Sequence, residues 1–195
     1  LSPLARLRKE ESGSTIIEFA MLAPTMLVLI MGAMDLSYRA YVTSVLEGEM
    51  QKAARDSGTE GVNAAKLNAI EARVKTQVGR IVRNATFTQL RKNYSSYLGT
   101  KPERFTDSNS NGVRDAGECF DDANGNSQWD ADPGNDGQGS AKDVVVYTMG
   151  VSYPRLFPMY GLLGWSQTEN ITVRTYLRNQ PYGTQVIPST RTICA

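Results

Sequence analysis

Oxygen-bearing side chains recur at every second position near the middle of this sequence. Asp107, Asn109, Asn111, Gly112, Asp115 and Glu118 follow the spacing D-x-N-x-N-G, with a glutamate closing the run. This alternation lets oxygens curl around one hard cation such as Ca²⁺, and the glycine permits the sharp turn. The Val113 carbonyl would add an oxygen, and Glu118 would close the sphere with both carboxylate oxygens. The spacing therefore predicts a calcium loop, with a solvated acidic loop as the alternative.

The same pattern returns further along the chain, beginning at Asp122 instead of Asp107. Its members are Asp122, Asn124, Asn126, Gln128 at the carbonyl-donating position, and Asp130. Pro133 occupies the place of the closing glutamate, so Asp121, Asp132 or Asp136 would have to substitute for it. We therefore expect the second site to be weaker than the first, or to share ligands with it. Because no clear helix flanks either loop, we expect isolated calcium loops rather than a paired EF-hand sensor.

The cysteines and the missing histidine restrict the remaining chemistry. Cys119 and Cys194 are the two cysteines, and the sequence has no histidine. In an exported domain the pair favours a disulfide that ties the first loop to the carboxyl end, although spacing alone leaves free thiols open. Without histidine the commonest general base and the usual zinc ligand are absent, so we expect no transition-metal chemistry.

An apolar segment near the amino end has the length of a membrane span. Residues from Ile16 to Met34 are apolar or small except Glu18 and Thr25, and as a helix they would cover about 28 Å. Three basic residues precede it, namely Arg6, Arg8 and Lys9. The positive-inside rule then predicts a cytoplasmic amino terminus and an exported remainder. A buried core helix is the alternative.

The elements that follow the span indicate an α+β domain. Apolar positions at helical spacing continue the first helix to residue 57, where Gly58 ends it. A second amphipathic helix is predicted over residues 63–84. Residues 143–153 and 169–178 are rich in β-branched and aromatic side chains, which predicts strands of an antiparallel sheet.

The residues around the start of the span carry a more specific pattern. Gly13 is followed by Ser14, and Glu18 lies five positions after the glycine and directly before Phe19. This arrangement resembles the signature that prepilin peptidases cleave. The resemblance implies cleavage between Gly13 and Ser14, and an assembly role in which Glu18 pairs with the new amino group of a neighbouring subunit. A carboxylate in an apolar run usually has a partner, although an interfacial glutamate favoured by the helix dipole is the alternative.

The segment GSTIIEFAMLAPTMLVLIMGAMDLS and the later strand and turn TVRTYLRNQPYG together resemble the TadE-like family of tight-adherence pilus proteins. The resemblance implies an inner-membrane pseudopilin or minor pilin that a prepilin peptidase processes and that assembles with other pilin subunits through its first helix. We accordingly expect a cytoplasmic leader over residues 1–13 and an amino-terminal helix over residues 14–57. An exported domain would cover residues 58–195, with the calcium loops as an insertion over residues 107–136.

Other functional classes find less support. Lys plus Arg number 21 against 20 Asp plus Glu, and the basic second helix lacks aromatic residues, so we expect no nucleic-acid binding. No nucleophile beside a base and no phosphate-binding glycine loop is present, so we expect no enzyme. The competing hypothesis is a membrane-anchored calcium-binding adhesin or periplasmic module that never polymerises. The pilin hypothesis places the chain in the inner membrane or, after assembly, in an extracellular pilus.

Overall fold

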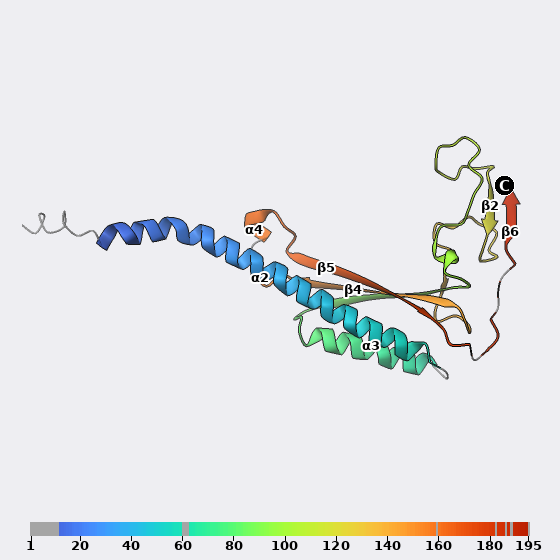
Figure 1. The fold of residues 1–195 in the computed structure, drawn as a ribbon, viewed down its shortest axis with the longest axis horizontal. Coiled ribbons are helices and arrows are strands. Elements are labelled where there is room, and N and C mark those ends of the chain that lie inside the picture. Colours follow the sequence, from blue (N-terminus) through green and yellow to red (C-terminus); the bar gives the residue numbers. More distant parts are fainter. Residues whose placement is uncertain are drawn as a thin grey trace, which may run out of the picture.

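A long helix, a shorter helix packed on it and an antiparallel sheet make up most of the molecule (Figure 1). The structure is a computed structural model and describes residues 12–59, 63–158, 160–181, 183–185, 187 and 189–194. The predicted α+β class, with a long amino-terminal helix, a second helix and an antiparallel sheet, is confirmed. Most of the predicted leader, residues 1–11, lies outside the described residues.

Helix α2 (Ser12–Ser57) is continuous over 46 residues. Its first half projects away from the rest of the molecule, and its second half lies along the sheet (Figure 1). In the second half Val42, Leu46, Met50 and Ala53 are completely buried. Their spacing puts them on one face of the helix, where each large apolar side chain contributes about 1.5 to 3 kcal/mol by leaving water. The exposed first half has no such packing against the residues that the structure describes.

Helix α3 (Ala64–Gly79) packs against α2 through Val74 and Val78, which are completely buried. Asn63 caps its first turn, because the Asn63 side chain accepts a hydrogen bond of 2.9 Å from the Lys66 amide. The prediction that this helix continues to residue 84 is wrong. The chain must reverse into the sheet, and Asn84 adopts a left-handed φ of 54° that no helix tolerates.

The main sheet has the strand order β3-β1-β4-β5, with all neighbours antiparallel. Its strands are β1 (Thr86–Tyr94), β3 (Asn135–Asp136), β4 (Val144–Pro154) and β5 (Thr168–Arg178). Alternate residues of β4, namely Val145, Tyr147, Met149, Val151 and Tyr153, are buried in or beside the core. This period of two is what a strand with one covered face requires. The strands predicted over residues 143–153 and 169–178 are therefore confirmed to within one residue at each end.

Shorter elements complete the described fold. They are the 3-10 helix η1 (Leu98–Thr100), the helix α4 (Tyr160–Leu163) between β4 and β5, and the strands β2 (Cys119–Asp122) and β6 (Arg191–Cys194). Strands β2 and β6 form a separate two-stranded sheet. It lies, with the predicted calcium loops, at the end of the molecule farthest from the projecting half of α2 (Figure 1).

A buried group of charges fastens α2 to the ends of β4 and β5. The Arg155 guanidinium contacts a carboxylate oxygen of Asp35 and one of Glu169, and Arg39 approaches Glu169 at 2.9 Å. Asp35 is only 3% exposed and Glu169 only 6%. These four residues are here called the Arg155 ion group, and two of them, Asp35 and Arg39, come directly after the predicted span. The two buried carboxylates are tolerated because Arg155 and Arg39 together compensate their charges.

Candidate assembly helix and calcium loops

The first half of α2 presents an apolar surface that no other described part of the chain covers. Ile16, Phe19, Met21 and Leu29 are each more than 60% exposed, and the helix is long and apolar enough to cross a membrane. Such a surface fits a membrane anchor or a contact between subunits. Glu18 is exposed within this stretch. The proposed roles of Glu18 and Phe19 in assembly stay predictions.

The predicted cleavage position lies in the first turn of α2. Gly13 and Ser14 are both helical in backbone conformation. Nothing in their described geometry tests whether a peptidase cuts between them, so processing also stays a prediction.

In the first predicted calcium loop the backbone curls around two carboxylates. Asp107 accepts hydrogen bonds from the amides of Asn111 at 3.1 Å and Gly112 at 2.7 Å. Gly112 has a φ of 76°, the left-handed conformation for which glycine is needed. The two oxygens of Glu118 accept from the amides of Ser108 at 2.8 Å and Asp115 at 3.0 Å. The first and the last acid of the motif, Asp107 and Glu118, therefore both bind backbone amides of the same short loop.

The second loop repeats this geometry. Asp122 accepts from the amides of Gly125 at 2.7 Å and Ser127 at 3.0 Å. Gly125 and Ser127 both have positive φ values, 81° and 63°, as Gly112 has in the first loop. The repeat that the sequence predicted is therefore a repeat of structure.

Asparagine amides occupy the centre of both loops. Asn109 and Asn111 each donate to a carboxylate oxygen of Asp115 at 2.7 Å. Asn124 and Asn126 donate to Asp130 in the same manner, at 2.8 and 2.6 Å. A cation at either centre would need these amide groups to rotate, so that their oxygens face it. Carboxylate and amide oxygens are the ligands that a hard cation such as Ca²⁺ prefers.

The remaining predicted ligands donate backbone amides in this arrangement. Val113 donates to the Asn111 side chain at 2.8 Å, and Gln128 donates to Asn126 at 2.7 Å. Across the described residues no three His, Cys, Asp or Glu side chains gather into a metal centre by themselves. Both loops instead combine carboxylates with amide oxygens, and calcium binding to them stays a prediction.

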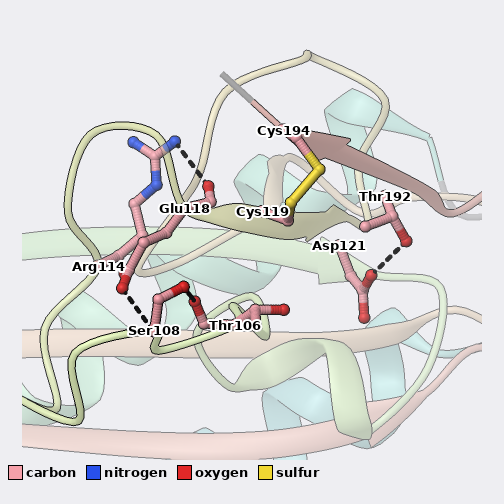
Figure 2. Close-up of a disulfide and its surroundings, with 8 residues drawn as sticks. All are labelled: Thr106, Ser108, Arg114, Glu118, Cys119, Asp121, Thr192 and Cys194. Carbon is pink, nitrogen blue, oxygen red and sulfur yellow. Dashed lines mark hydrogen bonds between the residues drawn. A yellow bond between two sulfur atoms is a disulfide. The ribbon is translucent and has the colours of Figure 1, made fainter.

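The two cysteines form the predicted disulfide (Figure 2). The sulfur atoms of Cys119 and Cys194 are 2.05 Å apart, and the two residues face each other in the β2–β6 pairing. Beside them Thr192 donates to Asp121 at 2.8 Å. Because Cys119 directly follows Glu118, the disulfide fastens the carboxyl-terminal strand to the end of the first loop.

One acid near the second loop has a structural role that the sequence did not reveal. Asp132 accepts hydrogen bonds from Lys92 at 2.8 Å and from the Tyr94 hydroxyl at 2.7 Å. Burial alone would raise the pKa of Asp132, but these hydrogen bonds outweigh burial and lower the pKa below its usual value. Burial and the contact with Asp132 raise the pKa of Tyr94. The trio fastens the second loop to strand β1.

An exposed apolar half-helix continuous with the core helix of a small α+β domain fits the class of single-span, membrane-anchored proteins. Within that class, the family model described as TadE-like protein matches residues 13–56. The predicted resemblance to the TadE-like family is thereby confirmed over this segment, which is nearly the whole of α2. No curated protein and no solved structure matches the chain.

Proposed function

We propose that this protein is a pilin-like structural subunit, a pseudopilin or minor pilin, of a tight-adherence type pilus. The observation that carries the proposal is the TadE-like match over residues 13–56, on a helix whose first half is exposed and apolar. Before assembly this half would lie in the inner membrane. In a filament it would pack against the same helix of other pilin subunits.

The proposed orientation has the amino terminus in the cytoplasm and the domain exported. Arg6, Arg8 and Lys9 before the span favour it through the positive-inside rule. The Cys119–Cys194 disulfide also favours it, because disulfides persist in oxidising compartments outside the cytoplasm. A prepilin peptidase would then cut between Gly13 and Ser14 on the cytoplasmic side.

Replacing Glu18 by alanine is expected to prevent incorporation into fibres while leaving membrane insertion intact. Removing a carboxylate makes the span more apolar, so insertion does not suffer. The matched control is Glu47→Ala, which removes an exposed carboxylate of α2 outside the predicted span. Fractionation followed by immunoblotting of sheared fibres would compare the variants. Equal incorporation of both would reduce Glu18 to an interfacial residue.

Mass spectrometry of the wild-type subunit from the same fibres tests processing, with Ser14 expected as the first residue. An intact leader in assembled, functional material would contradict the proposed cleavage. Failure of the protein to co-purify with any fibre would instead favour the competing function, a membrane-anchored calcium-binding module that does not polymerise.

We further propose that calcium stabilises the exported domain through the first loop, with the second loop as an additional site. The spacing of carboxylates and amides supports this proposal, as does the curled backbone around Asp107 and Glu118. Clustered acids repel one another without a cation. Binding to the folded state alone then adds stability, about 2.7 kcal/mol per site at a hundredfold excess over the dissociation constant.

Chelation of calcium is therefore expected to lower the melting temperature of the full chain in detergent by several degrees. Asp107→Ala and Glu118→Ala should each remove much of this calcium-dependent shift, whereas Glu47→Ala should retain it. Differential scanning calorimetry with and without chelator makes the measurement. A melting temperature that changes with neither calcium nor chelator would show that the segment over residues 107–136 is only a solvated insertion.

A further inference from the structure

We propose that Glu103 is the missing closing ligand of the second calcium loop, so that the chain carries two complete sites. The inference rests on the proposed calcium function of the loops. The two oxygens of Glu103 accept hydrogen bonds from the amides of Ala123 at 2.7 Å and Asp130 at 2.9 Å. Glu103 lies before both loops in the sequence, yet its carboxylate reaches into the second one.

The contacts of Glu103 in the second loop match those of Glu118 in the first. Glu118 accepts from the second and ninth residues of its own loop, Ser108 and Asp115. Ala123 and Asp130 hold the same two positions of the second loop. The backbone agrees as well, because the Glu118 amide donates to the Asp115 carbonyl at 3.2 Å and the Glu103 amide to the Asp130 carbonyl at 3.0 Å.

Strand pairing outside the loops explains how Glu103 comes to lie at the second loop. Phe105 and Phe120 form an antiparallel bridge, supported by a hydrogen bond of 2.8 Å from the Thr106 amide to the Cys119 carbonyl. In this register Glu118 stands opposite Asp107, and Glu103 stands opposite Asp122. Each loop therefore receives one aspartate from one side of the bridge and one glutamate from the other side.

The burial of these carboxylates points to a cation. Glu103 is 4% exposed, Glu118 6% and Asp122 2%. The oxygens of all three accept hydrogen bonds from backbone amides, which carry no net charge. Buried carboxylates without a compensating charge are costly, even when backbone amides solvate them. A divalent cation at each loop supplies the missing charge, and the oxygen ligands select a hard cation such as Ca²⁺.

Other acids near the second loop have different partners. Asp121 accepts from Thr192, and Asp132 is held by Lys92 and Tyr94. Neither is shown to contact the second loop as Glu103 does. Asp132 fastens the loop from outside, so Asp121 serves as the matched control for removal of a nearby carboxylate.

Trp129 allows the second loop to be observed on its own. It lies inside that loop, whereas residues 107–118 contain no aromatic side chain. Terbium, which occupies oxygen-rich calcium sites, should therefore emit on excitation of Trp129 when it fills the second loop of the full chain in detergent. Trp129→Phe should remove the emission without removing binding. Glu103→Gln is expected to weaken terbium binding at least tenfold, as Asp122→Asn should, since loss even of an outer-shell partner costs about ten- to hundredfold.

The controls separate the possible outcomes. Glu118→Gln and Asp121→Asn should keep the terbium emission of the second loop. Unchanged emission in Glu103→Gln would overturn the inference. Calorimetry with calcium should give two sites for the wild type and one for Glu103→Gln, and the retained first site shows that this variant has folded.

A measurement on the wild type tests the role of Glu103 without depending on whether the variant folds. The NMR signal of the Glu103 side-chain carboxyl carbon should move on calcium addition, as that of Glu118 should; a static Glu103 signal beside a moving Glu118 signal overturns the inference. If the wild type binds a single calcium ion that Glu118→Gln abolishes, the calcium proposal stands and the role of Glu103 fails. If the wild type binds none, both fail.

Discussion

Replacing Arg155 by methionine is expected to lower the free energy of unfolding by about 3 to 5 kcal/mol. The Arg155 guanidinium is the buried positive charge that contacts both Asp35 and Glu169, which are almost fully buried. Methionine fills a similar volume but leaves these carboxylates without Arg155 in a low-dielectric setting. Removing one partner of a buried ion pair costs far more than the pair itself contributes. Denaturant titration of the full chain in detergent, followed by circular dichroism of the sheet, would measure the change.

Arg39→Met is the matched control for this experiment. Arg39 also pairs with Glu169, but its side chain is 52% exposed, so water compensates its loss. We expect a cost of at most about 1 kcal/mol. Equal unfolding midpoints for the two variants would mean that burial does not decide the strength of this group.

Loss of the disulfide is expected to be the second large effect. Cys119 and Cys194 are 75 residues apart, and a cross-link over that length removes about 4 kcal/mol of chain entropy from the unfolded state. Cys119→Ala combined with Cys194→Ala should therefore destabilise the exported domain by about 2 to 5 kcal/mol. Strand β6 would lose its covalent connection to β2, and the end of the first loop would lose its covalent anchor.

Denaturant titration with and without reductant provides the comparison. Reductant should destabilise the wild type toward the level of the double variant, and it should leave that variant unchanged. If oxidised wild type and double variant unfold at the same denaturant concentration, the cross-link contributes nothing and β6 is held by its other contacts.

The sequence predicted the elements whose signals are local. The buried face of α2 is visible in the sequence as apolar residues at helical spacing. The alternation of buried and less buried residues in β4 is likewise visible as apolar residues at every second position. Both signals depend on residues close together in the chain. The cysteine pair was predictable because only one pairing of two cysteines exists.

Contacts between distant segments were not predictable in the same way. Arg155 pairs with Asp35 across 120 residues, and no spacing rule links the two. Helix α3 was predicted too long, because the apolar pattern continues through Val82 although the chain has already begun to turn. Val82 is buried because it packs against the core, although it lies beyond the end of the helix.

The role proposed for Glu103 has a signal in the sequence. It precedes Asp107 by the same interval at which Glu118 precedes Asp122. The repeat therefore begins at the glutamate, not at the aspartate. The substitutes predicted for the second loop, Asp121, Asp132 and Asp136, stay predictions; if Glu103 closes this loop as proposed, strand pairing brings the earlier end of the repeat back to the later loop.

A pull along α2 would act directly on the core of the domain. The helix is about 69 Å long at 46 residues, and its apolar half continues directly into its buried half. Tension on the apolar half is therefore transmitted to Val42 and Leu46, and through Arg155 to the ends of β4 and β5, in shear. Contacts loaded in shear must yield together rather than one after another. Mechanical strength and folding stability thus depend on the same contacts. A substitution that destabilises the core therefore also lowers the force that the connection between helix and domain withstands.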